Sequence, residues 1–503
     1  MDNSIADRAL AAVGRRLREN RLPFFSALLF GLLAHGFQLL NKIPVDDDLP
    51  SMWNKGATTV SGRYGLELLR LVLPDFSMPW LWGLLSLLFL ALALCLVVKL
   101  FHIRSRVLQL LLAGIFAAFP AETATLAYMY TAAPYALALL LTVLGVWVFA
   151  GGKRGRWILA PLLIAFSCSV YQCYFAFASS FCVILMVQRL AEGEDARTVL
   201  LEGLRLLGML LLALAVYGLS VLIAFRLLGL PLLDEVVNSR QSLPLRAAVA
   251  YSAWLKTLFK GYFAYVWSKP LLLCHLLLLV CAAASLARRL HGRALADLLV
   301  LGLCLFLFPL SCYCLYLLVD NSYIHSLVLY PFASLYVLCA VLLDEGGPRP
   351  ALTLQRAASL ALALILAGQI VFANAFTLYA KLQFEQSKAM YTAILAQVCD
   401  TEGFDEHSRL ALVGEAPAAR TELEGYFPFA QLQLPGVNIT DPLQAEPLIR
   451  NYLGCDLPFA DEAERAAVAE TAEYAAMPVW PYAGSVKKIG DVIAVKLEDP
   501  DRP

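Results

Sequence analysis

Three adjacent carboxylates, Asp46, Asp47 and Asp48, directly follow the first long apolar stretch of the chain. Because like charges repel one another, the pKa of at least one of them is expected to rise unless a cation lies nearby. A carboxylate with a raised pKa at a membrane surface is suited to act as a general base. Two alternatives stay open: the acids belong to an ordinary solvated loop, or they bind a divalent cation.

Cations and aromatic side chains follow in two long loops, 42–77 and 229–269. The stretch 247–267 of the second loop is amphipathic, which predicts a helix lying at the membrane interface with cations that attract a lipid phosphate. The alternative is an aromatic belt with lysines that extend toward water. The candidate binding residues in the first loop are Trp53, Lys55, Arg63 and Tyr64, and those in the second are Arg240, Lys256 and Lys260.

Smaller polar sets occur in three other segments between apolar stretches, and all are expected on the same side of the membrane. Polar aromatic residues that face hydroxyl groups commonly bind carbohydrate, although tyrosine is also enriched at membrane interfaces in general. We therefore interpret these sets together as candidate substrate-binding residues: Glu122, Tyr128 and Tyr130, then Tyr171, Gln172 and Tyr174, then Asn321 and His325.

The elements that must position these residues are membrane helices. Of the 503 residues, 60% are hydrophobic and only 16% are charged, whereas soluble domains carry about 25% charged residues. This composition argues against a soluble enzyme, a disordered chain or a nucleic-acid binder. It predicts a mainly α polytopic membrane protein with about eleven spans, at 22–41, 78–98, 107–121, 133–150, 157–172, 174–188, 206–228, 270–287, 294–318, 325–343 and 351–378.

The distribution of Lys and Arg orients these spans, because positive residues stay on the cytoplasmic side of short loops. Arginines precede the first span, and the alternate short loops 99–106, 151–156, 189–205, 288–293 and 349–356 are basic. All of them fall on the inner side only if 157–188 forms two helices that meet at Tyr171–Tyr174. The sequence thus predicts a cytoplasmic N-terminus and an extracytoplasmic C-terminus.

The zero net charge of the chain conceals two unlike parts. Residues 1–379 hold 29 Lys/Arg and 19 Asp/Glu, whereas residues 380–503 hold 10 and 20. We expect a cytoplasmic interfacial helix at 1–21, a transmembrane domain at 22–379 and a soluble extracytoplasmic α/β domain at 380–503, with strands at 410–414 and 491–497. Cys399 and Cys455 of the soluble domain either form a disulfide or are buried thiols.

Few charges fall in the middle of a span, which argues against a coupled transporter. The arrangement instead resembles the GT-C superfamily of membrane glycosyltransferases, and more closely the bacterial type II glucosyltransferases that modify O-antigen. The segments that carry the resemblance are Asp47-Asp48-Leu49, Ser61-Gly62-Arg63-Tyr64, Tyr171-Gln172-Cys173-Tyr174, Met477-Pro478-Val479-Trp480-Pro481-Tyr482 and Gly484-Ser485-Val486-Lys487-Lys488-Ile489. The family usually shows one or two acids where this chain has three, so the choice among Asp46, Asp47 and Asp48 stays open.

The resemblance implies transfer of a sugar, glucose in the first instance, from a polyprenyl-phosphate carrier to an extracytoplasmic glycan, with inversion. Asp47 is our choice for the general base, and Arg63, Arg240, Lys256 and Lys260 are the candidates to hold the phosphate. No cofactor is expected. The implied location is a bacterial inner membrane, with membrane lipids and separate flippase and donor-synthase proteins as partners. The alternatives are a lipid-linked glycan flippase, or a polymerase or ligase that uses a lipid-pyrophosphate donor.

Overall fold

A computed structural model describes the chain in thirteen segments. They are 20–44, 49, 61–73, 76–152, 154–228, 241–259, 268–318, 326–344, 349–405, 407–418, 421–427, 439–440 and 442–497. The chain divides into two compact units, which are described separately. The first comprises Met1–Asn41, Gly56–Asn374 and Phe427–Leu434, and the second comprises Lys42–Lys55, Ala375–Tyr426 and Pro435–Pro503.

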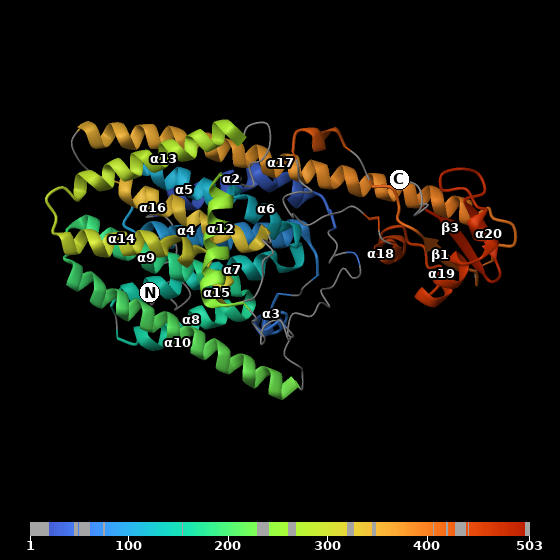
Figure 1. The fold of residues 1–503 in the computed structure, drawn as a ribbon, viewed down its shortest axis with the longest axis horizontal. Coiled ribbons are helices and arrows are strands. Elements are labelled where there is room, and N and C mark those ends of the chain that lie inside the picture. Colours follow the sequence, from blue (N-terminus) through green and yellow to red (C-terminus); the bar gives the residue numbers. More distant parts are fainter. Residues whose placement is uncertain are drawn as a thin grey trace, which may run out of the picture. The chain divides into compact units, whose positions relative to one another are not determined.

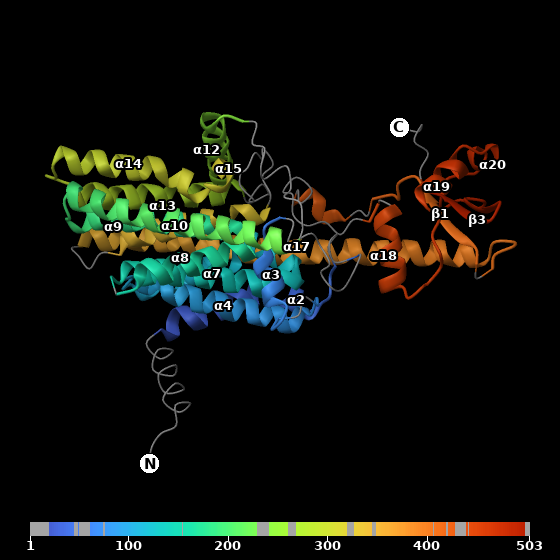
Figure 2. The same ribbon diagram turned by 90° about the horizontal axis from the view of Figure 1, so that it is seen from below.

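The first unit is built from helices (Figures 1 and 2). In chain order they are α2 (Arg21–Leu40), α3 (Tyr64–Leu69), α4 (Pro79–Leu100), α5 (Arg106–Ala118), α6 (Pro120–Ala127), α7 (Met129–Ala150), α8 (Arg156–Val170), η2 (Gln172–Tyr174), α9 (Phe175–Glu192), α10 (Ala196–Leu228), α12 (Leu243–Phe259), α13 (Ser268–Arg289), α14 (Leu295–Cys312), α15 (Leu315–Leu318), η3 (Ser326–Ala333), α16 (Ser334–Leu343) and α17 (Arg349–Cys399). The division between the units falls inside α17.

Among the described residues, nine helices are long and apolar enough to cross a membrane, and the bent pair α5–α6 makes a tenth. The pair bends by 42° at Pro120, where the ring cannot donate the next helical hydrogen bond. Helix α8 is shorter, with 15 residues. A helix therefore lies at each of the eleven expected positions, and the mainly α polytopic fold is confirmed.

The long apolar stretch 157–188 breaks into two helices. Tyr171, between α8 and η2, is extended with φ −155° and ψ 115°. Ser169, before the break, and Gln172, after it, both contact the segment 61–65. Arg156 at the start of α8 and Gln188 near the end of α9 instead bond to Phe149 and Phe101, at the other end of the bundle. The two helices thus run in opposite directions, as the loop charges predicted.

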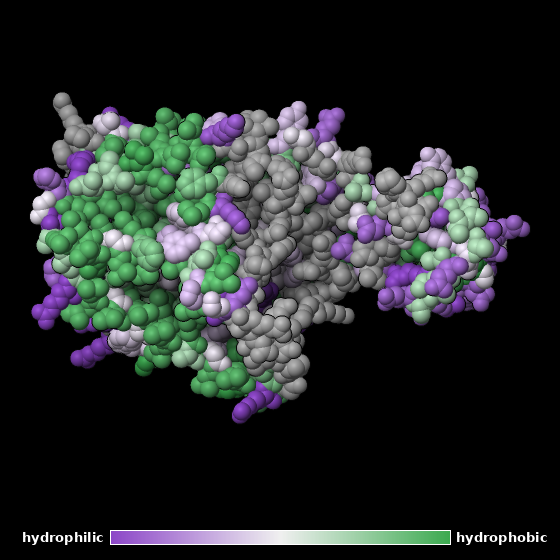
Figure 3. All heavy atoms as spheres, viewed as in Figure 1, coloured by the Kyte–Doolittle hydropathy of each residue, from purple (hydrophilic) through white to green (hydrophobic). Residues whose placement is uncertain are grey.

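The basic loops gather at one end of the helical unit. Figure 3 shows hydrophilic side chains where α13 turns into α14, beside an apolar surface over these two helices. Such an exposed apolar surface is typical of contact with lipid. Three hydrogen bonds join neighbouring loops and helix ends there: Arg293 Nη1 to Gly193 O at 2.7 Å, Ser105 N to Asp344 Oδ1 at 2.9 Å and Gln188 Nε2 to Phe101 O at 3.1 Å.

The second unit is a small α/β domain. Its sheet has the order β1-β3-β2, with β1 (Arg409–Val413) parallel and β2 (Val486–Ile489) antiparallel to β3 (Val492–Lys496). The end of α17 and the helices η4 (Glu422–Gly425), α18 (Pro442–Tyr452), α19 (Glu462–Ala469) and α20 (Ala472–Ala475) complete it. Both expected strands are present, whereas β2 was not expected. Cys399 is exposed, Cys455 is half-buried, and both are free thiols.

Candidate functional site

The turn Ser61-Gly62-Arg63, before α3, is held by two side chains from distant helices. Gln172 Nε2 donates to Ser61 O at 2.7 Å, and Tyr217 Oη donates to Gly62 O at 3.1 Å. Gln172 Nε2 also lies 2.9 Å from Tyr217 Oη. Gly62 has φ +76°, a left-handed conformation that other residues adopt only at a cost. The two polar side chains therefore fix the backbone that presents Arg63.

The guanidinium of Arg63 lies against tyrosine side chains. Its Cζ is 4.8 Å from the ring centroid of Tyr171, a distance typical of a cation–π contact. Its Nη1 lies 3.4 Å from Tyr135 Oη. The rings of Tyr135 and Tyr171 stack on each other, with centroids 4.5 Å apart and planes 12° apart. Among the residues that the structure describes, Arg63 is thus oriented by the ring face of Tyr171 and one long hydrogen bond.

Within the described residues, Arg63 does not use all of its hydrogen-bonding capacity. The residue is half-buried, and its Nε is shielded from solvent and has no hydrogen-bond partner in the part of the chain that the structure describes. Burial disfavours the charged guanidinium, but the oxygens of Tyr135, Tyr171 and two further tyrosines outweigh it and raise the pKa of Arg63. Arg63 is therefore a cation at neutral pH. Donors of a shielded cation are costly to leave unpaired, so the site is suited to an anionic ligand.

Helix α3 lies directly against α8. A Cβ on Gly65 would come within 2.8 Å of the backbone carbon of Ser169, so only glycine permits this contact. On the next residue back, Tyr64 Oη donates to Ser220 Oγ at 2.5 Å. The position of α3 is therefore set by α8 and α10 together, and Tyr64 acts as a structural tie in the described structure.

The other tyrosines that the sequence predicted lie near Tyr135 and Tyr171. Tyr174 packs edge-on against Tyr171 and Tyr135, at centroid distances of 5.7 and 6.3 Å. Tyr128 and Tyr130 pack against each other at 6.4 Å, and Tyr130 acts electrostatically on Arg63. The structure thus brings Arg63 together with residues from α7, η2 and α10 that are far apart in the sequence.

Glu122 lies deeper in the bundle, with 2% of its surface exposed. Ser86 Oγ lies 3.5 Å from its Oε1, and both Tyr174 and Tyr330 are near enough to interact with it electrostatically. A carboxyl group in this position has little contact with solvent. The role of Glu122 in substrate binding stays a prediction.

The remaining predicted residues do not join this cluster within the described structure. Lys256 lies exposed on α12, beside the half-buried Trp254 and the buried Leu258, which agrees with the predicted amphipathic pattern. The described residues include no group of three His, Cys, Asp or Glu side chains able to hold a metal ion. Outside the described residues lie Asp46, Asp47, Asp48, Trp53, Lys55, Arg240, Lys260, Asn321 and His325.

Two residues of the cluster were missed by the sequence prediction. Tyr135 and Tyr217 both lie inside long apolar helices, α7 and α10. A single tyrosine in an apolar stretch is usually a packing residue, so their role was not evident. A signal was available for Tyr135, which lies near the start of α7, whereas Tyr217 lies in the middle of the predicted span 206–228 and carried no local signal. Tyr217 is 21 residues beyond Ala196, roughly 30 Å along α10 at the helical rise of about 1.5 Å per residue.

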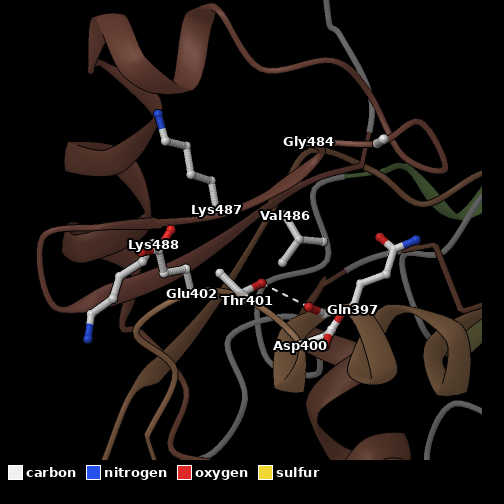
Figure 4. A pocket seen from close by; sticks show the side chains of 9 residues that line it. Gln397, Asp400, Thr401, Glu402, Gly484, Val486, Lys487 and Lys488 are labelled. Atoms are coloured by element: carbon white, nitrogen blue, oxygen red, sulfur yellow. Dashed lines mark hydrogen bonds between the residues drawn. The ribbon is translucent and has the colours of Figure 1, made fainter.

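The second unit has a polar hollow of its own, with a volume of about 540 Å³. Figure 4 shows that its lining side chains come from the end of α17 and from β2 with the turn before it. Thr401 Oγ1 donates to Gln397 O at 2.8 Å, and Lys488 Nζ donates to Gly403 O at 2.7 Å. Two of its polar side chains therefore already donate hydrogen bonds to backbone carbonyls of the same domain.

Comparison with known proteins identifies the family. The sequence profile of the family described as Glucosyl transferase GtrII matches residues 36–343, which include Arg63 and all the tyrosines described above. No curated protein matches the chain. The match covers more than half of the sequence and agrees with the resemblance noted from its motifs. The chain therefore belongs to the GtrII glucosyltransferase family and is a membrane-embedded glycosyltransferase.

Proposed function

We propose that this glycosyltransferase moves glucose from a polyprenyl-phosphate carrier to an extracytoplasmic surface glycan, with inversion at the anomeric carbon. The observation that carries this proposal is the Arg63 cluster. Its cation has tyrosine neighbours and a shielded Nε that has no hydrogen-bond partner among the described residues. A guanidinium binds phosphate oxygens through charge-assisted hydrogen bonds, and the phenol groups suit a sugar.

In the proposed reaction, a carboxylate of the first loop removes the proton from an acceptor hydroxyl. We assign this role to Asp47, with Asp46 and Asp48 as the alternatives. The oxygen then attacks the anomeric carbon from the side opposite the phosphate. The new C–O bond forms as the bond to the phosphate oxygen breaks, and polyprenyl phosphate leaves with one more negative charge.

Arg63 is proposed to stabilise this charge on the leaving phosphate. A cation helps catalysis most when it lies where charge develops in the transition state. The phosphate needs no separate acid, and a guanidinium is an alternative to a metal ion as the source of positive charge. Lys256, together with Arg240 and Lys260, is proposed to attract the lipid phosphate from the membrane surface.

The proposed orientation in the membrane is supported by the separation of the two ends of the bundle. The basic loops lie at one end, and the Arg63 cluster lies at the other end of α8, α9 and α10. Because basic loops stay in the cytoplasm, we propose that the cluster and the C-terminal domain are extracytoplasmic. In a bacterial inner membrane, this requires a flippase and a donor synthase as partners that deliver the lipid-linked sugar.

The test uses the purified protein in vesicles with polyprenyl-phosphate-[14C]glucose and a bacterial surface polysaccharide. We expect labelled polysaccharide whose mass grows by one hexose per acceptor site. Transport of the lipid without product would favour a flippase, and addition of many sugars from a lipid pyrophosphate would favour a polymerase or ligase.

The assignment of the base is tested by three matched variants, Asp46→Asn, Asp47→Asn and Asp48→Asn. Each removes one carboxylate and keeps the size of the side chain. We expect Asp47→Asn to abolish transfer while the other two retain a measurable rate. Full activity of Asp47→Asn would remove Asp47 from this role, and loss in one of the others would transfer the role to that residue.

A further inference from the structure

The first loop is attached to the C-terminal domain. Residues Lys42–Lys55 belong to the second compact unit, although the family match and the sequence order place them with the helical unit. Leu49 has no exposed surface and lies in the same buried cluster as Phe384, Tyr391 and Leu448. The side chain that directly follows the three acids is therefore part of the core of the soluble domain.

A hydrogen bond reinforces this attachment. Asn451 Nδ2 in α18 donates to Leu49 O at 2.8 Å. On the other side of the acids, Ile43 packs in a partly buried position against the same cluster. Both flanks of the segment that holds Asp46, Asp47 and Asp48 therefore contact one core, with only five residues between Ile43 and Leu49.

The core that receives Leu49 lies on one face of the sheet. Leu410, Leu412, Ile493 and Val495 face this cluster, whereas Ala411 and Ala494 belong to a second cluster with Met477. Alternate residues of a strand point to opposite faces, so the two cores are separate. Met477 thus offers a site where the same domain can be perturbed without touching the loop.

We infer that the C-terminal domain is a positioning element of the transferase: through Leu49 and Asn451 it holds the loop that carries the acid triplet. This inference rests on the proposed function, in which one of these acids is the base. An aspartate has a short side chain, so the location of its carboxylate depends on the backbone. Displacement of a reacting group by about 1 Å can lower a rate about 100-fold.

Kinetic measurements on three variants test the inference in the full-length protein. We expect Leu49→Ala to lower kcat at least about tenfold, with the KM for polyprenyl-phosphate-glucose little changed, because only the positioning of the base is disturbed. Asn451→Ala should lower kcat to a smaller extent, and Leu49→Met should restore most of the rate. Met477→Ala, a comparable truncation in the opposite core, should keep the wild-type kcat per folded molecule.

A second measurement reports the attachment without using activity. In a background that carries Cys399→Ser and Cys455→Ser, the thiol introduced by Leu49→Cys should react slowly with a membrane-impermeant maleimide, and rapidly once the domain is unfolded in urea. Cys399 of the wild type, which is exposed, sets the rate for an accessible thiol.

The outcomes separate the two proposals. Labelling of the introduced thiol as fast as that of Cys399 would overturn the attachment, and an unchanged kcat in Leu49→Ala would overturn the positioning role. If all three aspartate variants kept full activity while the thiol stayed protected, the proposed base would be wrong although the attachment would stand. An equal loss of kcat in Met477→Ala would show a general effect on the domain and would also overturn the inference.

Discussion

Two arginines at opposite ends of the helical unit have contrasting surroundings. Arg293, in the loop between α13 and α14, donates to the carbonyls of Gly193 and Glu194 and forms an ion pair with Asp297 at 3.1 Å. Arg63 contacts the face of Tyr171 and one phenol oxygen. In the described part of the chain, the first arginine joins two loops and pairs with a carboxylate, whereas the second has no carboxylate partner.

The difference shows why the residue type alone does not identify a binding site. Arginines in the basic loops are abundant because loop charge sets the orientation of the spans. A guanidinium whose donors are used by carbonyls and carboxylates contributes to stability. One that is held in place by ring faces, with no carboxylate partner among the described residues, is the one that we propose binds a ligand. The following predictions test this contrast.

The largest effect is expected for Arg63→Met. We expect glucose transfer to fall about 100- to 1,000-fold, because the donor that stabilises the developing phosphate charge is lost. The midpoint of thermal unfolding should stay close to that of the wild type or rise, since a poorly paired cation is removed from a shielded position. Transfer rates and unfolding in the same detergent measure the two quantities.

Arg63→Lys serves as the control for charge. It keeps the positive charge but loses the planar guanidinium group and its contact with the ring of Tyr171. The rate of glucose transfer should therefore lie between those of the wild type and Arg63→Met. A wild-type rate of glucose transfer in Arg63→Met would contradict the proposed difference between the two arginines.

The opposite pattern is expected for Arg293→Met. Removing this side chain leaves two carbonyls without their donor and takes the ion pair from the buried Asp297, which keeps its hydrogen bond from Ala196 N. The free energy of unfolding should therefore fall by about 1–3 kcal/mol. The transfer rate per folded molecule should be unchanged. Arg197→Met, at an exposed arginine of the neighbouring helix, should change neither quantity, and a loss of activity in Arg293→Met without a loss of stability would contradict the prediction.

A smaller effect is expected for Tyr217→Phe. This change removes the hydroxyl group that donates to Gly62 O, a hydrogen bond expected to contribute about 0.5–1.5 kcal/mol. Because that bond holds the turn before Arg63, we expect a roughly three- to tenfold loss in kcat/KM. Combining Tyr217→Phe with Arg63→Met should add little further loss, and fully additive effects in this double-mutant cycle would show that Tyr217 acts independently of Arg63.

No effect is expected from chelation. If Arg63 provides the charge that stabilises the leaving phosphate, transfer in EDTA should proceed at the rate measured without it. Restoration of a lost rate by Mg²⁺ or Mn²⁺ would instead favour a divalent cation at Asp46–Asp48. The comparison between the two arginines would then concern donor binding alone.

The sequence predicted the helical architecture well because each element has a local signal. Apolar length gave the spans, loop charge gave the reversal at Tyr171–Tyr174, and short apolar stretches gave the strands near 410 and 493. Within the site, Arg63 and Tyr171 were both selected, but from loops treated separately. Tyr135 and Tyr217 were missed because nothing local separates a site tyrosine from a packing tyrosine inside an apolar helix.

The sequence by itself therefore determined the membrane character of the chain, its approximate spans and its family, since these depend on composition, periodicity and short motifs. Only the tertiary structure decided which polar residues meet. It placed Arg63 against Tyr171, with no partner for its Nε among the described residues, and it buried Leu49 in the core of a domain about 400 residues away along the chain. The physical reason is that such contacts depend on long-range packing, which has no periodicity along the sequence.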